Sequence, residues 1–340
     1  MPDISFVIPF RNEEAFLATT LASLREQDLG NFSAEVLLVD GASTDRSREI
    51  LQPFLGDQRG SLSIRVLDNP ARTTPFAFNI GIAAARSDII GFGGAHTIYP
   101  PAYLRRAVEV LQESGADVVG GGFNRYISSV PGTLGEAMSC LYQSPIGAGV
   151  AAYLRRTSPG FVDTVYGGFY KRSVFSKVGG FDERLARNQD NELNARVKAA
   201  GLKIYFHPDL STSYVQKTDL SSFLRRGMKF GQYHPMTWRA NVRSFRLRHA
   251  VPALLVAYLM LLIVLGSIGQ LQLWFVTPLL AYGALLVLSA AQLSRRVGVL
   301  TAMATIPVFC LFHLSYGAGT WVGLGSLFRV ETASRLRHPV

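Results

Sequence analysis

The sequence predicts an α/β domain with a mainly parallel, doubly wound sheet, followed by a C-terminal transmembrane helical region. In the N-terminal part, short apolar segments typical of buried strands alternate with segments of helical periodicity. After Ala250, acidic residues disappear until Glu331, and long apolar runs take their place. The 340 residues are enough for one α/β domain and a smaller second part.

The predicted elements of the first part follow one another in a β-α-β-α rhythm. They cover, in order, residues 4–10, 13–27, 35–39, 45–54, 64–67, 76–85 and 89–92. Leu17, Leu21 and Leu24 recur at helical spacing in the first helix. Ser43 or Thr44 is expected to cap the second helix. Such alternation indicates a mainly parallel sheet covered by helices.

Polar residues follow three of the predicted strands at their carboxyl ends. They are Arg11, Asn12 and Glu13 after the first strand, residues 40–45 after the second, and residues 93–96 after the fourth. Ligands of doubly wound sheets bind beyond these ends, so we expect one crevice there. Asp40-Gly41 alone also fits a simple turn. No glycine-rich phosphate fingerprint follows the first strand, which disfavours Rossmann dinucleotide or P-loop binding.

A carboxylate cluster occupies a predicted loop-to-helix junction, in the segment GGFDERLARNQDNEL at residues 179–193. Asp190 lies near the helix start, where the helix dipole and free N–H groups favour its ionised form. An ionised Asp there can accept a proton from a sugar hydroxyl. The alternative is structural: Asp190 caps the helix, and Glu192 pairs with Arg196.

In their order along the chain, these motifs resemble those of the inverting family 2 glycosyltransferases. The likeness is to the branch of membrane-associated enzymes that build bacterial exopolysaccharide. The motifs that carry it are residues 8–13 (IPFRNE), 38–45 (LVDGASTD), Asn69-Pro70 with Arg72, Asn79-Ile80-Gly81, and 179–192. The resemblance extends from about residue 3 to 235. It implies a Rossmann-like GT-A fold that binds a nucleotide-sugar donor, with a UDP-sugar expected.

The resemblance also implies roles for individual residues. Pro9, Asn12 and Glu13 would line the uracil and ribose pocket. Asp40 would meet the base or ribose, and Arg72 would fork onto the diphosphate. The remaining predicted donor-site residues are Asn79, Gly94, Ala95 and His96. Asp190 would be the catalytic base, and the candidates for acceptor or diphosphate contacts are Gln189, Glu192, Arg225, Arg226 and Gln232.

One departure from the family pattern concerns the metal. The family places Asp-x-Asp or Asp-x-His after the fourth strand, where this chain has Gly94-Ala95-His96. His96 alone is a poor Mg²⁺ ligand but suits Mn²⁺ better. Three interpretations stay open: a divalent metal (Mg²⁺ or Mn²⁺) held mainly by the diphosphate and His96, a metal-free site in which basic side chains neutralise the leaving group, or a disabled enzyme.

Charge and cysteine content restrict the surroundings of the protein. The formal net charge is +10, and residues 217–249 hold eight Lys or Arg against one acid, just before the first apolar run. Juxtamembrane basic clusters face the cytoplasm and anionic lipid, so a membrane surface is favoured over nucleic acid. Cys140 and Cys310 suggest neither a disulfide framework nor a zinc site. No signal peptide is recognised, so the first part is expected in the cytosol.

The expected domain division is a GT-A domain at 1–235, a basic juxtamembrane linker at 236–249, a transmembrane region at 250–328 and a basic tail at 329–340. In the transmembrane region, 250–267 and 271–291 are long enough for a helical hairpin. The segment 297–328 contains Pro307 and several glycines. A straight span would put the tail's arginines outside, so a broken or re-entrant element is expected. His313 contacts either a lipid-linked acceptor or a neighbouring helix.

Two further segments are apolar but less regular. Residues 137–154 are too interrupted for a spanning helix; they form either an element resting on the membrane face or a core helix of the first domain. Residues 223–232 mix aromatic and basic residues as an amphipathic helix on the membrane surface does.

The expected reaction is transfer of a sugar, with inversion, from the nucleotide sugar to a polyprenyl-diphosphate-linked acceptor at the inner face of a bacterial cell membrane. A second interpretation is a polyprenyl-phosphate sugar synthase, whose lipid phosphate needs no base. A third, of another class, is a nucleotide-binding membrane subunit without activity. Activity of Asp190→Asn separates the first two, and any transfer by pure protein excludes the third.

Overall fold

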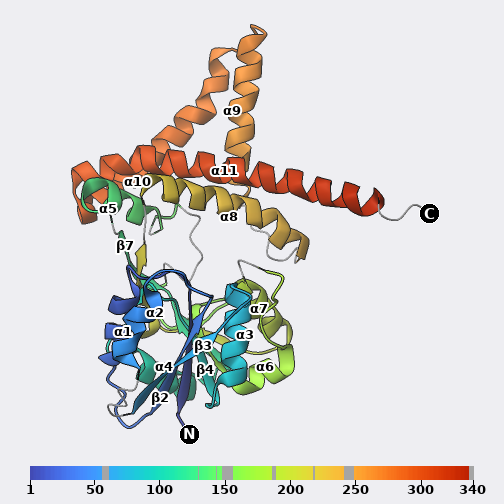
Figure 1. Cartoon of the computed structure of the whole chain (residues 1–340). Helices are drawn as coiled ribbons and strands as arrows, with labels where there is room; N and C mark the ends of the chain where they lie inside the picture. The colour runs from blue at the N-terminus through green and yellow to red at the C-terminus, as the bar shows by residue number, and fades with distance from the viewer. Residues whose placement is uncertain are drawn as a thin grey trace. The chain divides into compact units, whose positions relative to one another are not determined.

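The structure, a computed structural model, describes residues 1–55, 61–128, 130–142, 144–147, 156–185, 189–216, 219–240 and 249–336 (Figure 1). The chain forms two compact units, and each is discontinuous in sequence. The first consists of Met1–Arg125 and Ala151–Val215, and the second of Tyr126–Val150 and Gln216–Val340.

The first unit is built on a mixed β-sheet. Its described strands are β1 (Ile4–Phe10), β2 (Ala34–Asp40), β3 (Leu62–Asp68), β4 (Ile89–Phe92), β6 (Val118–Gly121), β8 (Gly160–Phe161), β9 (Tyr166–Lys171) and β10 (Ile204–Phe206). They lie in the order β3-β2-β1-β4-β9-β6-β10-β8. The β3-β2-β1-β4 half is parallel, as the sequence predicts. β9 runs antiparallel to β4 and β6, which makes the whole sheet mixed.

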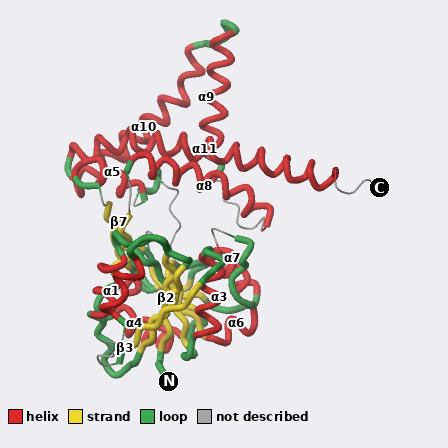
Figure 2. Tube along the Cα trace, in the orientation of Figure 1, coloured by secondary structure: helices red, strands yellow, loops and turns green. Residues whose placement is uncertain are grey.

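Helices cover both faces of this sheet, and alternate residues of β1 show why. Phe6 and Ile8 are buried with residues of α1 (Leu17–Arg25) and α4 (Tyr103–Ser114). Val7 points the other way, into a cluster with residues of α3 (Thr74–Ala84) and α7 (Gln189–Ala199). A central strand that is buried on both faces is mainly apolar, as β1 is apart from Ser5, whose hydroxyl donates to Glu35. The doubly wound arrangement can be followed in Figure 2.

The helix predicted over residues 13–27 begins later than expected, at Leu17. Two contacts with residues that follow β2 hold the segment before this helix. Glu13 donates its backbone N–H to Ser47 Oγ at 2.8 Å, and Glu14 donates its own to Asp45 at 3.0 Å. These side chains satisfy the N–H groups without helical backbone, so the helix starts after them.

The helix predicted over 45–54 is also shorter, because α2 covers Ser47–Leu51 and then tightens into the 3₁₀ turn η1 (Gln52–Phe54). Pro53 lies in the first turn of η1 and has no N–H to continue an α-helix. Neither Ser43 nor Thr44 caps α2. The Ser43 hydroxyl instead donates to Asp40 at 2.6 Å.

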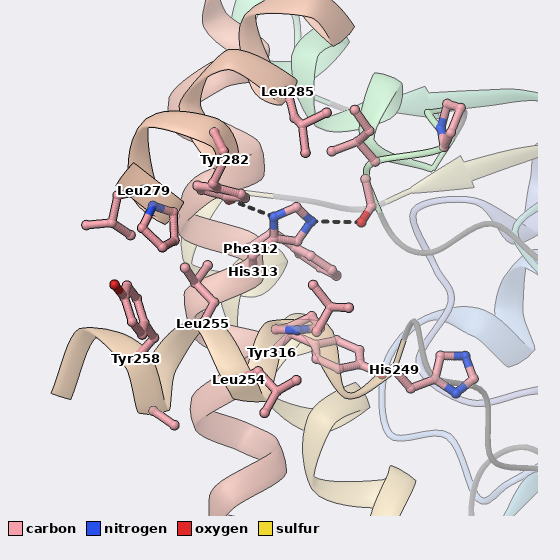
Figure 3. Close-up of a pocket in the computed structure, with 18 of the residues that line it drawn as sticks. His249, Leu254, Leu255, Tyr258, Leu279, Tyr282, Leu285, Phe312, His313 and Tyr316 are labelled. Carbon is pink, nitrogen blue, oxygen red and sulfur yellow. Dashed lines mark hydrogen bonds between the residues drawn. The ribbon is translucent and has the colours of Figure 1, made fainter. Parts of the chain in front are cut away.

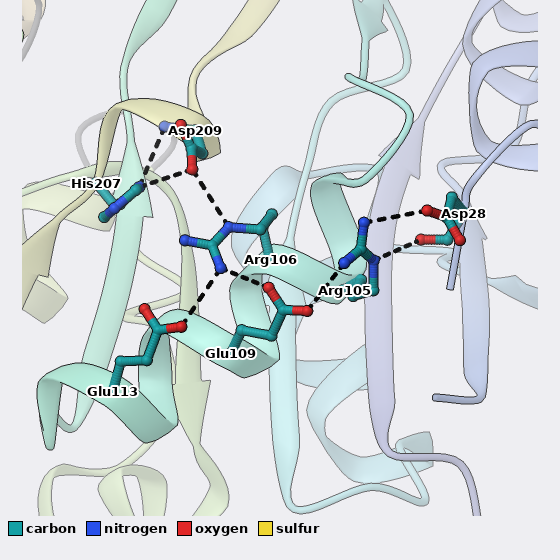
Figure 4. A network of polar contacts seen from close by, with 7 residues as sticks. All are labelled: Asp28, Arg105, Arg106, Glu109, Glu113, His207 and Asp209. Carbon is teal, nitrogen blue, oxygen red and sulfur yellow. Dashed lines mark hydrogen bonds and ion pairs between the residues drawn. The ribbon is translucent and has the colours of Figure 1, made fainter. Parts of the chain in front are cut away.

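A charged network fixes α4 to the rest of the first unit (Figure 4). Arg105 pairs with Asp28, and Arg106 pairs with Asp209 of the loop after β10, at 3.1 and 3.2 Å. Glu109 accepts from both arginines. Hydrogen bonding by Arg106, supported by the charge of Arg105, lowers the pKa of Glu109 below its ordinary value of 4.5. One carboxylate thus holds two guanidinium groups in place.

The second unit is mainly helical in its described residues. Its helices are α5 (Gly132–Leu141), α8 (Leu220–Ala240), α9 (Val251–Ser267), α10 (Thr277–Val297) and α11 (Val299–Leu336). α9 and α10 extend together from α11, and Tyr258 of α9 donates to the backbone of Phe275 just before α10 (Figure 1). By length and composition, Leu273–Val297 and Val299–Leu327 are apolar enough to cross a membrane, whereas α9 is a shorter apolar helix.

The break expected between 297 and 328 is absent, because α11 runs through Pro307 as one helix. Its glycines serve close packing instead. A Cβ on Gly319 would lie 2.1 Å from the backbone oxygen of Met228, and one on Gly323 would lie 2.4 Å from that of Gln232. On α8, a Cβ on Gly231 would lie 2.0 Å from the backbone oxygen of Tyr316. Glycines four residues apart let helix backbones approach closely, so α8 belongs with α11 in the second unit and not with the first.

α5 is not a core helix of the first unit, which was one of the two alternatives for residues 137–154. Its buried residues Met138 and Leu141 share a core with Phe309 and Phe312 of α11. Thr301 also donates to Glu136 at 2.8 Å. The helix is therefore part of the core of the second unit. Residues 148–155 of this segment, 241–248 of the expected linker and 337–340 of the tail lie outside the described residues.

Candidate active site

Three parallel strands end in register at one edge of the sheet. Phe10, Asp40 and Asp68 are direct neighbours across β1, β2 and β3. Among the described residues, the non-glycines with left-handed backbone are Asn12, Ala42 and Arg72, with φ of 55°, 56° and 64°. One lies in the loop after each of these strands. Such backbone costs about 1 kcal/mol or more per residue and clusters at functional sites.

Asn12 joins the first two of these loops. Its side-chain oxygen accepts from the N–H of Thr44 at 2.8 Å, and its own N–H donates to Ser43 Oγ at 3.1 Å. Pro9 lies within β1 opposite Val39. Pro9 and Asn12, which are predicted to line the uracil and ribose pocket, thus lie at the same edge of the sheet. The amide oxygen of Asn12 bonds to the loop after β2.

Asp40 is enclosed by protein groups. Its side chain is 0% exposed and accepts from the N–H and hydroxyl of Ser43 at 2.9 and 2.6 Å. Its other oxygen accepts from Arg48, which also pairs with Asp68. Arg48 is half exposed, so its guanidinium is accessible although it pairs with two carboxylates. Contact between Asp40 and a nucleotide stays a prediction. Arg48 was not anticipated, because nothing in its sequence position links it to two carboxylates.

Two arginines at this edge carry uncompensated charge. In the part of the chain that the structure describes, the side chains of Arg11 and Arg72 have no hydrogen-bond or ion-pair partner, and both are exposed. Arg72 is held by its backbone, whose N–H donates to the oxygen of Asn69 at 3.1 Å. Arg11 follows β1 and Arg72 follows β3, so both cations lie beyond the carboxyl ends of the parallel strands, where they attract an anionic ligand.

Asn79 bonds to the loop that leads to α7. Its side chain donates to the backbone oxygen of Phe181 at 3.0 Å and accepts from the N–H of Phe181 at 2.8 Å. It also donates to Glu183 at 2.8 Å. These bonds use the whole amide on the loop that leads to α7. They hold this loop in place, and donor binding by Asn79 stays a prediction.

The residues at the family's metal position make internal contacts. Gly94 bonds through its N–H and its oxygen to the Tyr99 hydroxyl at 2.9 and 3.0 Å, and Ala95 is buried. His96 Nδ1 faces Glu13 at 3.3 Å, and Nε2 faces the Tyr214 hydroxyl at 2.6 Å. The described residues contain no group of three or more His, Cys, Asp or Glu that fits a metal ion. With both nitrogens of His96 engaged and no carboxylate at 94, these residues do not fit a metal held by protein ligands.

Asp190 stands in the first turn of α7, as expected, and is half-buried. Burial outweighs the backbone N–H groups of the helix start and raises the pKa of its carboxyl above the ordinary 3.8. The sequence argument expected the helix dipole to dominate, but it takes no account of burial. A raised pKa makes Asp190 a stronger base once it is ionised.

Side chains around α7 fix its first turns. Thr164 donates to Asn191 at 3.2 Å and accepts from Asn194 at 2.9 Å. Asn194 also accepts from the buried Tyr170 hydroxyl at 2.8 Å. These three contacts escaped sequence reasoning because their partners lie 24 to 30 residues apart.

The other predicted residues of α7 and α8 have structural contacts. Arg196 pairs with Glu192 at 2.7 Å, as the structural alternative for this segment predicted, and also donates to the backbone of Gly180. Gln189 is partly buried at the helix start. In the second unit, Arg225 donates to the hydroxyls of Ser221 and Ser222, while Arg226 and Gln232 also lie on α8.

One loop joins the base to the edge of the sheet. Thr164, which bonds the first turns of α7, lies two residues before Tyr166 at the start of β9. A Cβ on Gly94 would lie 3.5 Å from the Tyr166 hydroxyl. The helix start and the loop after β4 thus meet the same short segment. A partly buried carboxylate at a helix start and exposed guanidinium groups after parallel strands are the kinds of group that transfer from an anionic donor requires.

The fold and this edge define an α/β enzyme of the nucleotide-sugar transferase class. The model of the family Glycosyl transferase family 2 matches residues 5–179, more than half of the chain. The chain belongs to this family of glycosyltransferases and has its GT-A fold.

Individual relatives agree with this assignment. The chain is 27% identical over 321 residues to the succinoglycan biosynthesis protein ExoA of Rhizobium meliloti, covering 94% of this chain and 85% of ExoA. It is 26% identical over 233 residues to a dolichyl N-acetyl-α-D-glucosaminyl phosphate 3-β-D-2,3-diacetamido-2,3-dideoxy-β-D-glucuronosyltransferase of Methanococcus voltae, covering 67% and 71%.

Among solved structures, the mannosyltransferase PcManGT of Pyrobaculum calidifontis, in complex with GDP-Man and Mn²⁺, is similar in fold. The TM-score is 0.60 at 18% identity, with 89% of this chain and 86% of that one covered.

Proposed function

We propose that this enzyme transfers a sugar, with inversion, from a nucleotide sugar to a polyprenyl-diphosphate-linked acceptor during exopolysaccharide or cell-envelope glycan assembly. The observation that carries the proposal is Asp190: a partly buried carboxylate with a raised pKa at the start of α7, where the neighbouring Asn191 accepts from Thr164. The expected donor is a UDP-sugar, bound where β1, β2 and β3 end.

In this proposal, Asp190 takes the proton of the acceptor hydroxyl while the oxygen of that hydroxyl attacks the anomeric carbon. The bond from that carbon to the diphosphate oxygen breaks on the opposite face, and the nucleoside diphosphate leaves with both bonding electrons. Arg72 and Arg11 provide positive charge for the departing diphosphate, because their guanidinium groups have no competing partner among the described residues. Thr164 and Asn194 hold α7 so that Asp190 keeps its position.

The enzyme is proposed to act at the cytoplasmic face of a bacterial cell membrane. Two helices with membrane-spanning length and the basic run before α9 support this location. Confining enzyme and lipid acceptor to one surface raises their effective concentration.

The test measures nucleoside diphosphate release by the detergent-purified full chain with bacterial lipid extract. The donors are a panel of UDP-sugars and GDP-mannose. Release should require lipid and fall at least 100-fold in Asp190→Asn, the range for loss of a general base. Asp163→Asn, an exposed carboxylate paired with Lys198, is the control and should keep activity. Activity retained by Asp190→Asn with polyprenyl phosphate as acceptor would replace the proposal with a sugar-phosphate synthase. If none of the donors gave nucleoside diphosphate release, although the protein bound nucleotide, the proposal would be overturned.

A further inference from the structure

Two faces of α11 contact different helices of the second unit. On one face, Gly317 packs against the start of α9, and Trp321 donates to the backbone oxygen of Ala253 at 2.9 Å. Gly319 packs against the backbone of α8 and lies two residues from Gly317. At 3.6 residues per turn, two residues are about 200° apart. α8 and α9 therefore lie on opposite sides of α11, as Figure 1 shows.

α10 is held on the same side of α11 as α9. His313 of α11 bonds through Nδ1 to the Tyr282 hydroxyl of α10 at 2.8 Å, and through Nε2 to the backbone oxygen of Gly147 at 2.9 Å (Figure 3). His313 lies four residues before Gly317 and thus on nearly the same face. Both of its nitrogens contact neighbouring elements, as one of the two alternatives for this histidine predicted. α9 and α10 therefore form a hairpin on one side of α11.

The hairpin side is apolar and uncharged. Residues 250–294 contain no Asp, Glu, Lys or Arg. Large apolar side chains are exposed on both helices, Ile263 and Leu280 among them. On α11, the exposed Val299 and Met303 lie on the face that contacts α9, about five and four turns before that contact. A surface of this kind is stable in hydrocarbon and not in water.

The opposite side of α11 has charged neighbours at two levels. Thr301 lies on the face that contacts α8, about five turns before that contact, and donates to Glu136 of α5 at 2.8 Å. Farther along, Gly227 of α8 packs against α11. Arg225 and Lys229 are exposed, and each lies two residues from Gly227. These two cations are therefore on the side of α8 that faces away from α11.

These neighbours are incompatible with a path of α11 across a bilayer, although its length and composition would allow one. Phe223, two residues before Arg225, packs on Phe312 with ring centroids 5.1 Å apart, so Arg225 is near the level of Phe312. The helix rises about 17 Å from Thr301 to Phe312 and about 23 Å from there to Leu327. Both distances are shorter than a hydrocarbon core of ~30 Å. A crossing α11 would place a charged neighbour inside the hydrocarbon, where charge is costly.

We propose that α11 lies in the membrane plane at the boundary between lipid and water, and does not cross the bilayer. The α9–α10 hairpin enters the hydrocarbon on one side of it. α5 and α8 lie on the aqueous side, where Arg225 and Lys229 contact anionic headgroups. The partner of this surface is a bilayer entered from one face. The proposal concerns how the second unit is embedded and does not depend on the proposed sugar transfer.

The experiment measures which thiols a membrane-impermeant maleimide reaches. Arg296→Cys, Lys229→Cys and Ile263→Cys are each made in a chain whose Cys140 and Cys310 are replaced by alanine. All three positions are exposed in the structure, so each thiol should be labelled in detergent. In inverted inner-membrane vesicles, the first two should be labelled at rates within threefold of each other, and Ile263→Cys at least tenfold more slowly. In spheroplasts, all three should be labelled at least tenfold more slowly than in detergent.

A protease-cleavable epitope after Val340 tests the far end of α11. It should be removed in inverted vesicles and stay intact in spheroplasts. Arg225→Cys repeats the measurement on α8, and UDP binding in detergent reports whether each variant folds.

Protection of Lys229→Cys and Arg225→Cys on both membrane faces would show that α11 crosses and would overturn the proposal. An epitope and an Arg296→Cys thiol that are accessible from opposite faces would do the same, as would rapid labelling of Ile263→Cys in vesicles. If the epitope and the thiols on α8 and at Arg296 were all accessible only in spheroplasts, the in-plane α11 would stand, and the cytoplasmic location in the proposed function would be refuted.

Discussion

Asn79 and Phe181 are joined by two hydrogen bonds, one in each direction, between a side-chain amide and a backbone peptide group. Together with the bond to Glu183, they fix the loop from which α7 begins. Asn79→Ala should therefore reduce the turnover number at least tenfold through displacement of Asp190, while the Kd for UDP changes less than threefold. Loss of the hydrogen bonds from Asn79 to this partly buried loop should also lower the free energy of unfolding by about 1–2 kcal/mol.

Isothermal titration with UDP and steady-state kinetics distinguish the two roles of Asn79. A Kd for UDP raised tenfold or more, at unchanged turnover, would establish the donor contact that the family resemblance implies and reject the positioning role.

Asp190→Asn should abolish transfer yet stabilise the folded protein at neutral pH. Because the folded-state pKa of Asp190 is raised, its contribution to stability is full below the unfolded value of about 3.8 and is lost as pH rises through the folded pKa. An asparagine at position 190 does not ionise, so the variant does not lose folding stability as pH rises. Thermal unfolding of both proteins from pH 4 to 8 should show an advantage for the variant that grows with pH. A wild-type protein more stable than Asp190→Asn at pH 7 would contradict the burial argument.

Gly94→Asp should create a metal site that the native residues do not provide. The new Cβ meets Thr97 Oγ1 at 3.2 Å and the Tyr166 hydroxyl at 3.5 Å, so a side chain fits with a small adjustment. Carboxylate and imidazole then stand two residues apart, as in Asp-x-His. The Kd of the native protein for UDP should change less than about threefold between Mn²⁺ and EDTA, and that of Gly94→Asp at least tenfold.

Gly94→Asn has nearly the same size without the charge and should behave as the native protein. Native UDP binding that collapses in EDTA would show that the diphosphate and His96 suffice to hold a metal.

Glu109→Gln should weaken the network around α4 by about 1 kcal/mol at pH 7, since partly exposed ion pairs are individually small. Because the pKa of Glu109 is lowered on folding, its stabilisation is present above the unfolded value of 4.5 and is lost as pH falls through the folded pKa. The difference between native and variant proteins should accordingly shrink in acid. Chemical unfolding of both proteins at each pH measures this difference in stability. Glu113→Gln is the control, because that carboxylate is 62% exposed and lies 3.5 Å from Arg106.

Gly319→Ala should destabilise the second unit by about 1–3 kcal/mol, the usual cost of overpacking. Its Cβ would clash with the backbone oxygen of Met228, and a backbone atom cannot move aside as the end of a flexible side chain can. Gly325→Ala on the same helix should be neutral or slightly stabilising, because no atom lies within 4 Å of its Cβ. Thermal unfolding in detergent compares them. Equal melting temperatures would show that α8 and α11 separate without penalty.

The sequence was sufficient for the parts of the fold that depend on local pattern. The strand at 4–10 and the strand at 89–92 have the predicted bounds, because apolar runs between polar residues leave little choice of edge. α1 begins late because Ser47 and Asp45, some thirty residues away, bond the N–H groups before it. No periodicity within residues 13–27 records those partners.

The candidate site residues also divide into those that local sequence predicts and those whose contacts depend on distant parts of the chain. Asp190 lies at a helix start, as its flanking residues predicted, and Glu192 pairs with Arg196 over one turn. The Tyr214 hydroxyl on His96 is 118 positions away, and the Arg48 bond to Asp68 crosses from a helix to a strand end. Burial of Asp190, which reverses the expected direction of its pKa shift, depends on the packed fold and on nothing in the adjacent sequence.

The discontinuity of the second unit also has a consequence during synthesis. α5 emerges from the ribosome early, but Phe309 and Phe312, against which Met138 and Leu141 pack, are made about 170 residues later. At roughly 5–20 residues per second, its apolar face waits on the order of ten seconds or more for its partners. The interval between translation of α5 and of α11 is therefore when a nascent chain most needs a chaperone or a bilayer to shield that helix.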